Sequence, residues 1–105
     1  MSKTASGPFA VGSNVYPGLF KLVEELGELA QVCGRLMQGH ALGMAVHWDG
    51  HEHKVRLLEE LADVSAMIDY VLVVNNLDMA EFHKRRSAKQ RQFHEWHHEQ
   101  KEQTK

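Results

Sequence analysis

The chain of 105 residues carries twelve basic and fourteen acidic side chains, and a formal charge of −2 excludes nucleic-acid binding through overall charge alone. Its single cysteine, Cys33, excludes an internal disulfide, and no segment approaches the roughly 18 apolar residues of a membrane span or the apolar run of a signal peptide. We therefore expect a soluble, cytoplasmic protein with one modest core, completed by assembly into a homodimer or homotetramer.

The chain divides into an arm, one domain and a tail. Residues 1–15 are rich in glycine and serine and lack a hydrophobic pattern, which predicts a flexible N-terminal arm. The patterned residues, 16–100, form the single domain, and the polar residues 101–105 are expected to fray.

The first predicted helix covers residues 16–38, where apolar side chains recur at helical spacing. Pro17 fits its first turn, where the missing N–H costs nothing. Gly39 is the expected stop. The following segment, QGHALGMAVHWDGHEH, is the expected connection.

A second helical pattern covers residues 53–74 and ends at two breakers, Asn75 and Asn76. Asp78 then begins a third helix, because Glu81 three residues later completes a capping box. Almost no segment alternates between apolar and polar residues, so the predicted fold class is all-α, with three long helices in each chain.

Two acidic motifs, VEELGEL and LEELADV, stand at matching places on the first two helices, 35 residues apart. At about 100° per residue, Glu25 and Glu28 lie on one flank of the first apolar stripe, and Glu24 lies further round. Glu60 and Asp63 lie on the matching flank of the second helix. Apolar residues continue that flank, so we expect Asp63 to be at least half buried.

Antiparallel packing with the acidic flanks facing would bring these four carboxylates into one small volume. Oxygen ligands at i, i+3 spacing suit a hard ion such as Mg²⁺ or Mn²⁺. The alternative is a set of solvated flank acids, and Glu24 and Glu59 are expected to be exposed in either case. The matched repeat favours the metal site.

The third helix carries a seam of six residues at alternating spacings of three and four, which predicts an inward-facing stripe. They are Met79, Phe82, Arg86, Lys89, Phe93 and Trp96. The two cations of this seam either snorkel to the surface or meet an anion in a polar pocket. Cations beside metal-binding carboxylates fit a polyanionic, metal-chelating substrate such as a nucleoside triphosphate. The chain has no glycine-rich phosphate loop, so metal and side chains would hold the phosphates.

The sequences EELGE and ELAD, with 31 residues between them, resemble the EExxE and ExxD motifs of the MazG-like all-α nucleoside triphosphate pyrophosphohydrolases. The resemblance extends over residues 16–96, and LDMAEFHKRRSAKQRQFHEW is similar to the third-motif helix of short phage and bacterial members. It implies a MazG-like helical bundle that cuts a (deoxy)nucleoside triphosphate between the α and β phosphates. The expected role is control or cleaning of the nucleotide pool in a bacterial or phage-infected cell, with Mg²⁺ or Mn²⁺ and more than one ion per site.

The resemblance also implies a role for each matching residue. The metal ligands would be Glu25, Glu28, Glu60 and Asp63. Glu24 would orient or deprotonate the attacking water. Arg86 and Lys89 rank first as phosphate-binding side chains, ahead of Lys84 and Arg91. Many relatives have a further helix before the first motif, so we expect a partner subunit to help cover the nucleobase.

Two other groups offer weaker signals. His94, Glu95 and His98 spell the HExxH zinc-protease signature, but Trp96 belongs to the inward seam and turns both histidines toward solvent. The loop histidines His47, His51 and His53, beside Asp49, have a loose metal-like spacing, although a solvated loop is favoured. Trp48 either stacks on a base or packs over a helix end.

The rival hypothesis is a non-catalytic interaction module. Its basic segment 83–91, HKRRSAKQR, would bind nucleic acid or an acidic partner. Such a module has no need of the acidic repeat, so nucleic acid is not the expected partner.

Overall fold

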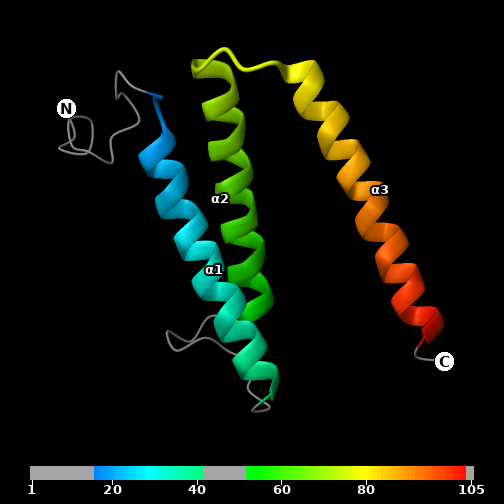
Figure 1. Cartoon of the computed structure of the whole chain (residues 1–105). Helices are drawn as coiled ribbons and strands as arrows, with labels where there is room; N and C mark the ends of the chain where they lie inside the picture. The colour runs from blue at the N-terminus through cyan, green and yellow to red at the C-terminus, as the bar shows by residue number, and fades with distance from the viewer. Residues whose placement is uncertain (1–15, 42–51, 104–105) are drawn as a thin grey trace.

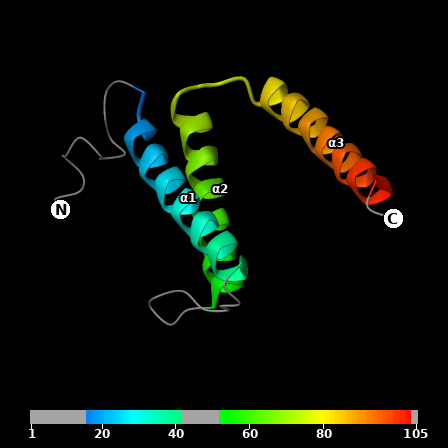
Figure 2. The same cartoon turned by 60° about the horizontal axis from the view of Figure 1, so that its bottom comes forward.

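The computed structural model describes residues 16–41 and 52–103, which fold into three α-helices without a β-strand. The helices are α1 (Leu19–Ala41), α2 (His53–Val74) and α3 (Met79–Gln103). Helices α1 and α2 lie side by side and antiparallel, and we call this pair the hairpin (Figures 1 and 2). Helix α3 diverges from the hairpin. The all-α prediction is confirmed, while the predicted arm, 1–15, lies outside the described residues.

A tight turn before α1 fixes the start of that helix. Tyr16 and Gly18 both adopt positive φ, of 50° and 84°, and the N–H of Leu19 donates to the carbonyl of Tyr16. Pro17 therefore lies in the turn before the helix and not in its first turn. A Cβ on Gly18 would lie 3.0 Å from the Tyr70 ring, so glycine meets both a conformational and a steric requirement here.

The predicted stop at Gly39 is wrong, because α1 continues to Ala41 and Gly39 is a buried position within it. A glycine inside a helix costs only about 1 kcal/mol relative to alanine. A cost of this size does not require a helix to end, so a single glycine is a weak stop signal.

The end of α2 is a Schellman motif, which confirms the two predicted breakers. Asn76 takes the left-handed conformation, with φ of 53°, and its N–H donates to the carbonyl of Val73. The N–H of Leu77 donates to the carbonyl of Leu72. Asn75 also ties this end to the start of α1, because its Nδ2 donates to the carbonyl of Pro17 at 3.0 Å.

Helix α3 begins as predicted. The Asp78 carboxylate accepts a hydrogen bond from the N–H of Glu81 at 3.1 Å, which is an N-cap interaction. The helix ends at Gln103, later than residue 100, where the domain was expected to end. Among the described residues, no helix combines the length and apolar character needed to cross a membrane.

The core lies between α1 and α2, where Val32, Val64 and Leu72 are buried. Helix α3 has no buried residue. The seam that was predicted to face inward is therefore not covered within one chain: Phe82 and Lys89 are half-buried, whereas Phe93 and Trp96 are more than half exposed. The spacing of a seam shows that a helix has an apolar face, but not which chain covers it.

Candidate metal centre

Three carboxylates lie close together between α1 and α2, and we call this group the centre. Glu25 from α1 and Glu60 and Asp63 from α2 each offer an oxygen, and these oxygens lie within 4.8 Å of one another. The pairing of α1 with α2 brings the two acidic motifs together, as the repeat in the sequence indicated. Glu28 lies close enough for its charge to raise the pKa of both Glu25 and Glu60.

The three side chains differ in burial. Glu60 is only 5% exposed, and the side chain of Glu25 is 15% exposed. Asp63 is exposed, which contradicts the prediction that it is at least half buried. Helix α1 covers the side of α2 that carries Glu60, and Asp63 lies about 60° further round the helix, beyond that contact.

Two carboxylate oxygens in this centre lack partners. Within the described residues, Glu25 Oε2 and Glu60 Oε2 are buried and accept no hydrogen bond. A buried carboxylate oxygen without a donor is costly, because it has lost its water and gained no replacement. The centre therefore favours binding a cation or a proton.

The pKa values of the two buried acids show the same tendency. Burial is the main cause that raises the pKa of Glu25 above its ordinary value, and the charges of Glu28 and Asp63 add to it. The pKa of Glu60 is raised by the same causes in the same order. Arg56 opposes the shift of Glu60, since its Nε lies 3.8 Å from Glu60 Oε1.

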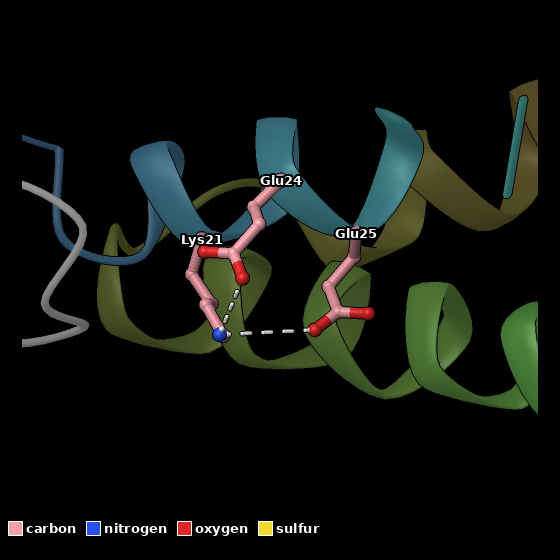
Figure 3. Close-up of polar contacts among 3 residues, drawn as sticks. All are labelled: Lys21, Glu24 and Glu25. Carbon is pink, nitrogen blue, oxygen red and sulfur yellow. Dashed lines mark hydrogen bonds and ion pairs between the residues drawn. The ribbon is translucent and has the colours of Figure 1, made fainter. Parts of the chain in front are cut away.

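Lys21 interacts both with Glu24 and with Glu25 of the centre (Figure 3). Its Nζ donates to Glu24 Oε1 at 3.2 Å and lies 4.0 Å from Glu25 Oε1. The hydrogen bond to Glu24 is the main cause that raises the pKa of Lys21. The carboxylate of Glu24, the predicted water-orienting acid, is thus held by Lys21 beside the group of three.

Sequence reasoning did not identify Lys21 or Arg56 as part of the site. The signal was present, because Lys21 precedes Glu24 and Glu25 by three and four residues and Arg56 precedes Glu60 by four. Residues at these spacings are neighbours on a helix surface. Lys21 and Arg56 are the cations whose charges oppose the raised pKa values of Glu25 and Glu60.

The predicted phosphate-binding cations do not join the carboxylates within this chain. Arg86 lines a hollow of about 470 Å³ between α2 and the start of α3, together with Asp69. The Nζ of Lys89 donates to Gln92 Oε1 on its own helix, at 3.2 Å. Lys84 and Arg91 are exposed on α3.

The histidines give no second centre among the described residues. His94 and His98 are exposed, and His98 Nε2 lies 3.8 Å from Glu102 Oε1. His53 is not a loop residue but the buried first residue of α2. His47, Trp48, Asp49 and His51 lie outside the described residues.

The arrangement offers a hard divalent cation a set of oxygen ligands with one buried side and one open side. Glu60 forms the buried side, while exposed Asp63 and Glu28 leave an approach for a substrate.

In comparisons with known proteins, no protein-family model, curated protein or solved structure matches the chain.

Proposed function

We propose that this chain is a metal-dependent nucleoside triphosphate pyrophosphohydrolase of the MazG-like type. It would hydrolyse a (deoxy)nucleoside triphosphate to the monophosphate and pyrophosphate, acting as a homodimer or homotetramer. The observation that carries the proposal is the pair of buried, unpartnered oxygens, Glu25 Oε2 and Glu60 Oε2, in a carboxylate group contributed by two antiparallel helices.

The residues present fit a divalent cation. Glu25, Glu60 and Asp63 would hold it, with Glu28 at the open edge. When bound, Mg²⁺ or Mn²⁺, with more than one ion in each site, would neutralise phosphate charge and lower the pKa of a coordinated water. The buried oxygens need such a charge, which solvated surface acids do not.

The chain's own residues supply the rest of the chemistry. Glu24 accepts the proton of the attacking water, and Lys21 holds that carboxylate in place through its hydrogen bond. The water oxygen forms a bond to the α or the β phosphorus as the bond from that phosphorus to the α–β bridging oxygen breaks, which releases the monophosphate and pyrophosphate. Arg86 and Lys89 stabilise the negative charge that develops on the pyrophosphate, with Lys84 and Arg91 in a lesser role. Trp48 remains the proposed base contact.

A second candidate function rests on the surface of α3. Five lysines and arginines occur within residues 83–91, and all except Lys89 are exposed. Such a stripe would bind nucleic acid or an acidic partner without turnover. The carboxylate centre has no role in that function.

A panel of triphosphates with Mg²⁺ or Mn²⁺ separates the two functions. The enzyme releases pyrophosphate from at least one of them, and Glu60→Gln abolishes the release while Glu59→Gln, at the exposed neighbouring position, retains it. Oligonucleotide binding that weakens with salt, without release of pyrophosphate from any triphosphate, would select the interaction module.

A further inference from the structure

The two buried glutamates of the centre each have a cation one helical turn before them. Lys21 precedes Glu25 by four residues on α1, and Arg56 precedes Glu60 by four residues on α2. Lys21 Nζ lies 4.0 Å from Glu25 Oε1 (Figure 3), and Arg56 Nε lies 3.8 Å from Glu60 Oε1. These distances are those of ion pairs rather than hydrogen bonds, so each cation acts on its glutamate through charge.

The repeat in the sequence includes these two cations. Residues 21–29, KLVEELGEL, and 56–64, RLLEELADV, match in residue class at every position. Because α1 and α2 are antiparallel, an approximate two-fold rotation interchanges the two segments (Figures 1 and 2). The contacts repeat as well: in both Glu25 and Glu60, Oε1 lies beside the cation and Oε2 is buried without a hydrogen bond from the described residues. Lys21 and Arg56 are therefore equivalent parts of the centre.

The negative charge of the centre exceeds the positive charge of these two side chains. Burial, and after it the charges of neighbouring acids, still raise the pKa of both buried glutamates although Lys21 and Arg56 act in the opposite direction. The acids that contribute are Glu25, Glu28, Glu60 and Asp63. The two cations thus reduce the repulsion between these carboxylates without removing it, which leaves a net negative charge for a divalent ion to neutralise.

We propose that Lys21 and Arg56 are built-in counter-ions of the centre, which stabilise the hairpin while the centre is empty and lower the affinity of the centre for a divalent cation. The inference rests on the proposed metal-dependent function. In the empty centre, each positive charge offsets repulsion between buried carboxylates. Once an ion is bound, the same charge repels it, because the side chain and the ion act on one carboxylate. Both residues are positioning residues and not metal ligands.

Coulomb's law gives the size of the second effect. Two cations that act on one carboxylate lie within several ångströms of each other. At such separations the repulsion between a unit charge and a divalent ion changes a Kd by about tenfold even at the dielectric constant of water. The Arg56 side chain is 34% exposed, so salt screens part of this repulsion. The centre can therefore lose and regain its ion while the hairpin stays folded.

Arg56 isolates the counter-ion role, because Lys21 also donates a hydrogen bond to Glu24, the proposed water-orienting acid. Arg56→Met removes the charge and keeps an unbranched apolar stem, whereas Arg56→Lys keeps a charge. Lys54→Met is the matched control. It removes one positive charge from an exposed position on the same helix, about 160° round from Arg56.

Urea unfolding in EDTA and in Mn²⁺ well above the wild-type Kd tests the proposal on the whole chain. In EDTA, Arg56→Met should unfold at a lower urea concentration than wild type, because Glu60 keeps its repulsion and loses its counter-ion. In Mn²⁺ the difference should shrink or reverse, because tighter binding adds more stability to the variant. Arg56→Lys should follow the wild type in both. An equal loss of stability in EDTA and in Mn²⁺ would identify an ordinary structural ion pair and would overturn the proposal.

Calorimetric titration with Mn²⁺ at low ionic strength measures the affinity itself. Arg56→Met should bind Mn²⁺ about tenfold more tightly than wild type, whereas Lys54→Met should change the Kd by less than about twofold. Lys21→Met, on the other helix, should change the Kd in the same direction, and it provides the test if Arg56→Met does not fold without metal. Unchanged or weaker Mn²⁺ binding by the two variants would contradict the counter-ion role.

These measurements separate the counter-ion role from the proposed activity. Tighter Mn²⁺ binding by Arg56→Met, with no hydrolysis of any triphosphate by the wild type, would support the counter-ions and refute the proposed function. Release of pyrophosphate by the wild type, with a Kd that neither variant tightens, would support the function and refute the counter-ions. A wild-type protein that binds no Mn²⁺ would refute both.

Discussion

Glu25 and Glu60 belong to helices that run in opposite directions, yet each buries one carboxylate oxygen, Oε2, that accepts no hydrogen bond within the described residues. Each also has a raised pKa, for which burial is the largest cause. Burial and mutual repulsion therefore destabilise the charged forms of these carboxylates, and this destabilisation provides the most direct tests of the proposed metal site.

Glu60→Gln should remove metal binding while preserving the helices. At a Mg²⁺ concentration about 100 times the Kd, binding adds about 2.7 kcal/mol to the free energy of unfolding of the wild-type protein. The variant should gain almost none of this, because it has lost its most buried ligand. Urea unfolding with EDTA and with Mg²⁺ measures the difference. Glu59→Gln, one position away and exposed, is the matched control and should respond like the wild type.

The pH dependence of apo stability should have an unusual sign. Glu25 and Glu60 have folded-state pKa values raised above the ordinary 4.5, so the folded state binds more protons than the unfolded state above that pH. Their contribution to stability is present below pH 4.5 and is lost as pH rises through the folded-state pKa values. Urea unfolding in EDTA should show this loss as a difference between wild type and Glu25→Gln/Glu60→Gln. The contributions of the other ionisable groups to the free energy of unfolding largely cancel in that comparison, because both proteins contain those groups. A difference that is constant with pH would contradict the raised pKa values.

Lys21→Met should slow turnover more than it affects folding. The change removes the hydrogen bond that holds Glu24, so we expect kcat to fall about tenfold, or about 1.4 kcal/mol of transition-state stabilisation. Lys21→Arg should restore part of the rate, since a cation returns. Steady-state kinetics at saturating metal gives the result, with exposed Lys54→Met as the control. Equal rates for Lys21→Met and wild type would remove Lys21 and its pairing with Glu24 from the mechanism.

The Lys89→Met variant tests whether Lys89 binds phosphate or has only a structural role. The half-buried side chain lies between Phe82 and Phe93 in the seam, so methionine should leave stability unchanged or raise it. Catalysis should fall by about 10- to 1000-fold, equivalent to about 1.4 to 4 kcal/mol. Arg85→Met, at an exposed position, is the control. Wild-type rate constants for Lys89→Met on its best triphosphate would exclude this residue from the site.

Leu58→Glu should convert the proposed oligomer to a monomer. The side chain is 68% exposed in one chain, so the substitution costs little within the monomer, but it would bury a charge if this exposed apolar position lies in the contact between copies. Light scattering at micromolar concentration should give half the mass of a wild-type dimer. Gln31→Glu, exposed on α1 away from that contact, should remain oligomeric. An unchanged mass for Leu58→Glu would show that Leu58 does not lie in the interface between copies.

The sequence was sufficient to predict the helices and several of their ends. Hydrophobic periodicity gave α2 its bounds, and the local chemistry of Asp78 and Asn76 predicted the start of α3 and the end of α2. The repeat of acids at i, i+3 also predicted that Glu25 would approach Glu60, because helix periodicity and antiparallel pairing together determine that contact.

The sequence did not reveal which half of each apolar stripe would be covered. Helix α1 covers the side of α2 that carries Glu60 and leaves Asp63 and Leu58 exposed on either side, so the exposure of Asp63 was predicted wrongly. This outcome depends on how far each helix is rotated about its own axis relative to its neighbour. Both helices together determine that rotation, so the pattern of one helix does not predict it. The uncovered seam of α3 has the same origin, because periodicity does not distinguish a contact within a chain from one between chains.

The hydrogen bond from Asn75 to Pro17 joins residues 58 positions apart, at the level where α1 begins and α2 ends. Together with Gly18, which fits against the Tyr70 ring, it sets how far one helix can slide along the other. A slip of one helical turn would displace Glu25 from Glu60 by about 5.4 Å, more than the spacing that brings the carboxylates together. These contacts therefore fix the axial position of α1 against α2, so the spacing of the carboxylates in the proposed metal centre depends on Asn75, which lies outside that centre.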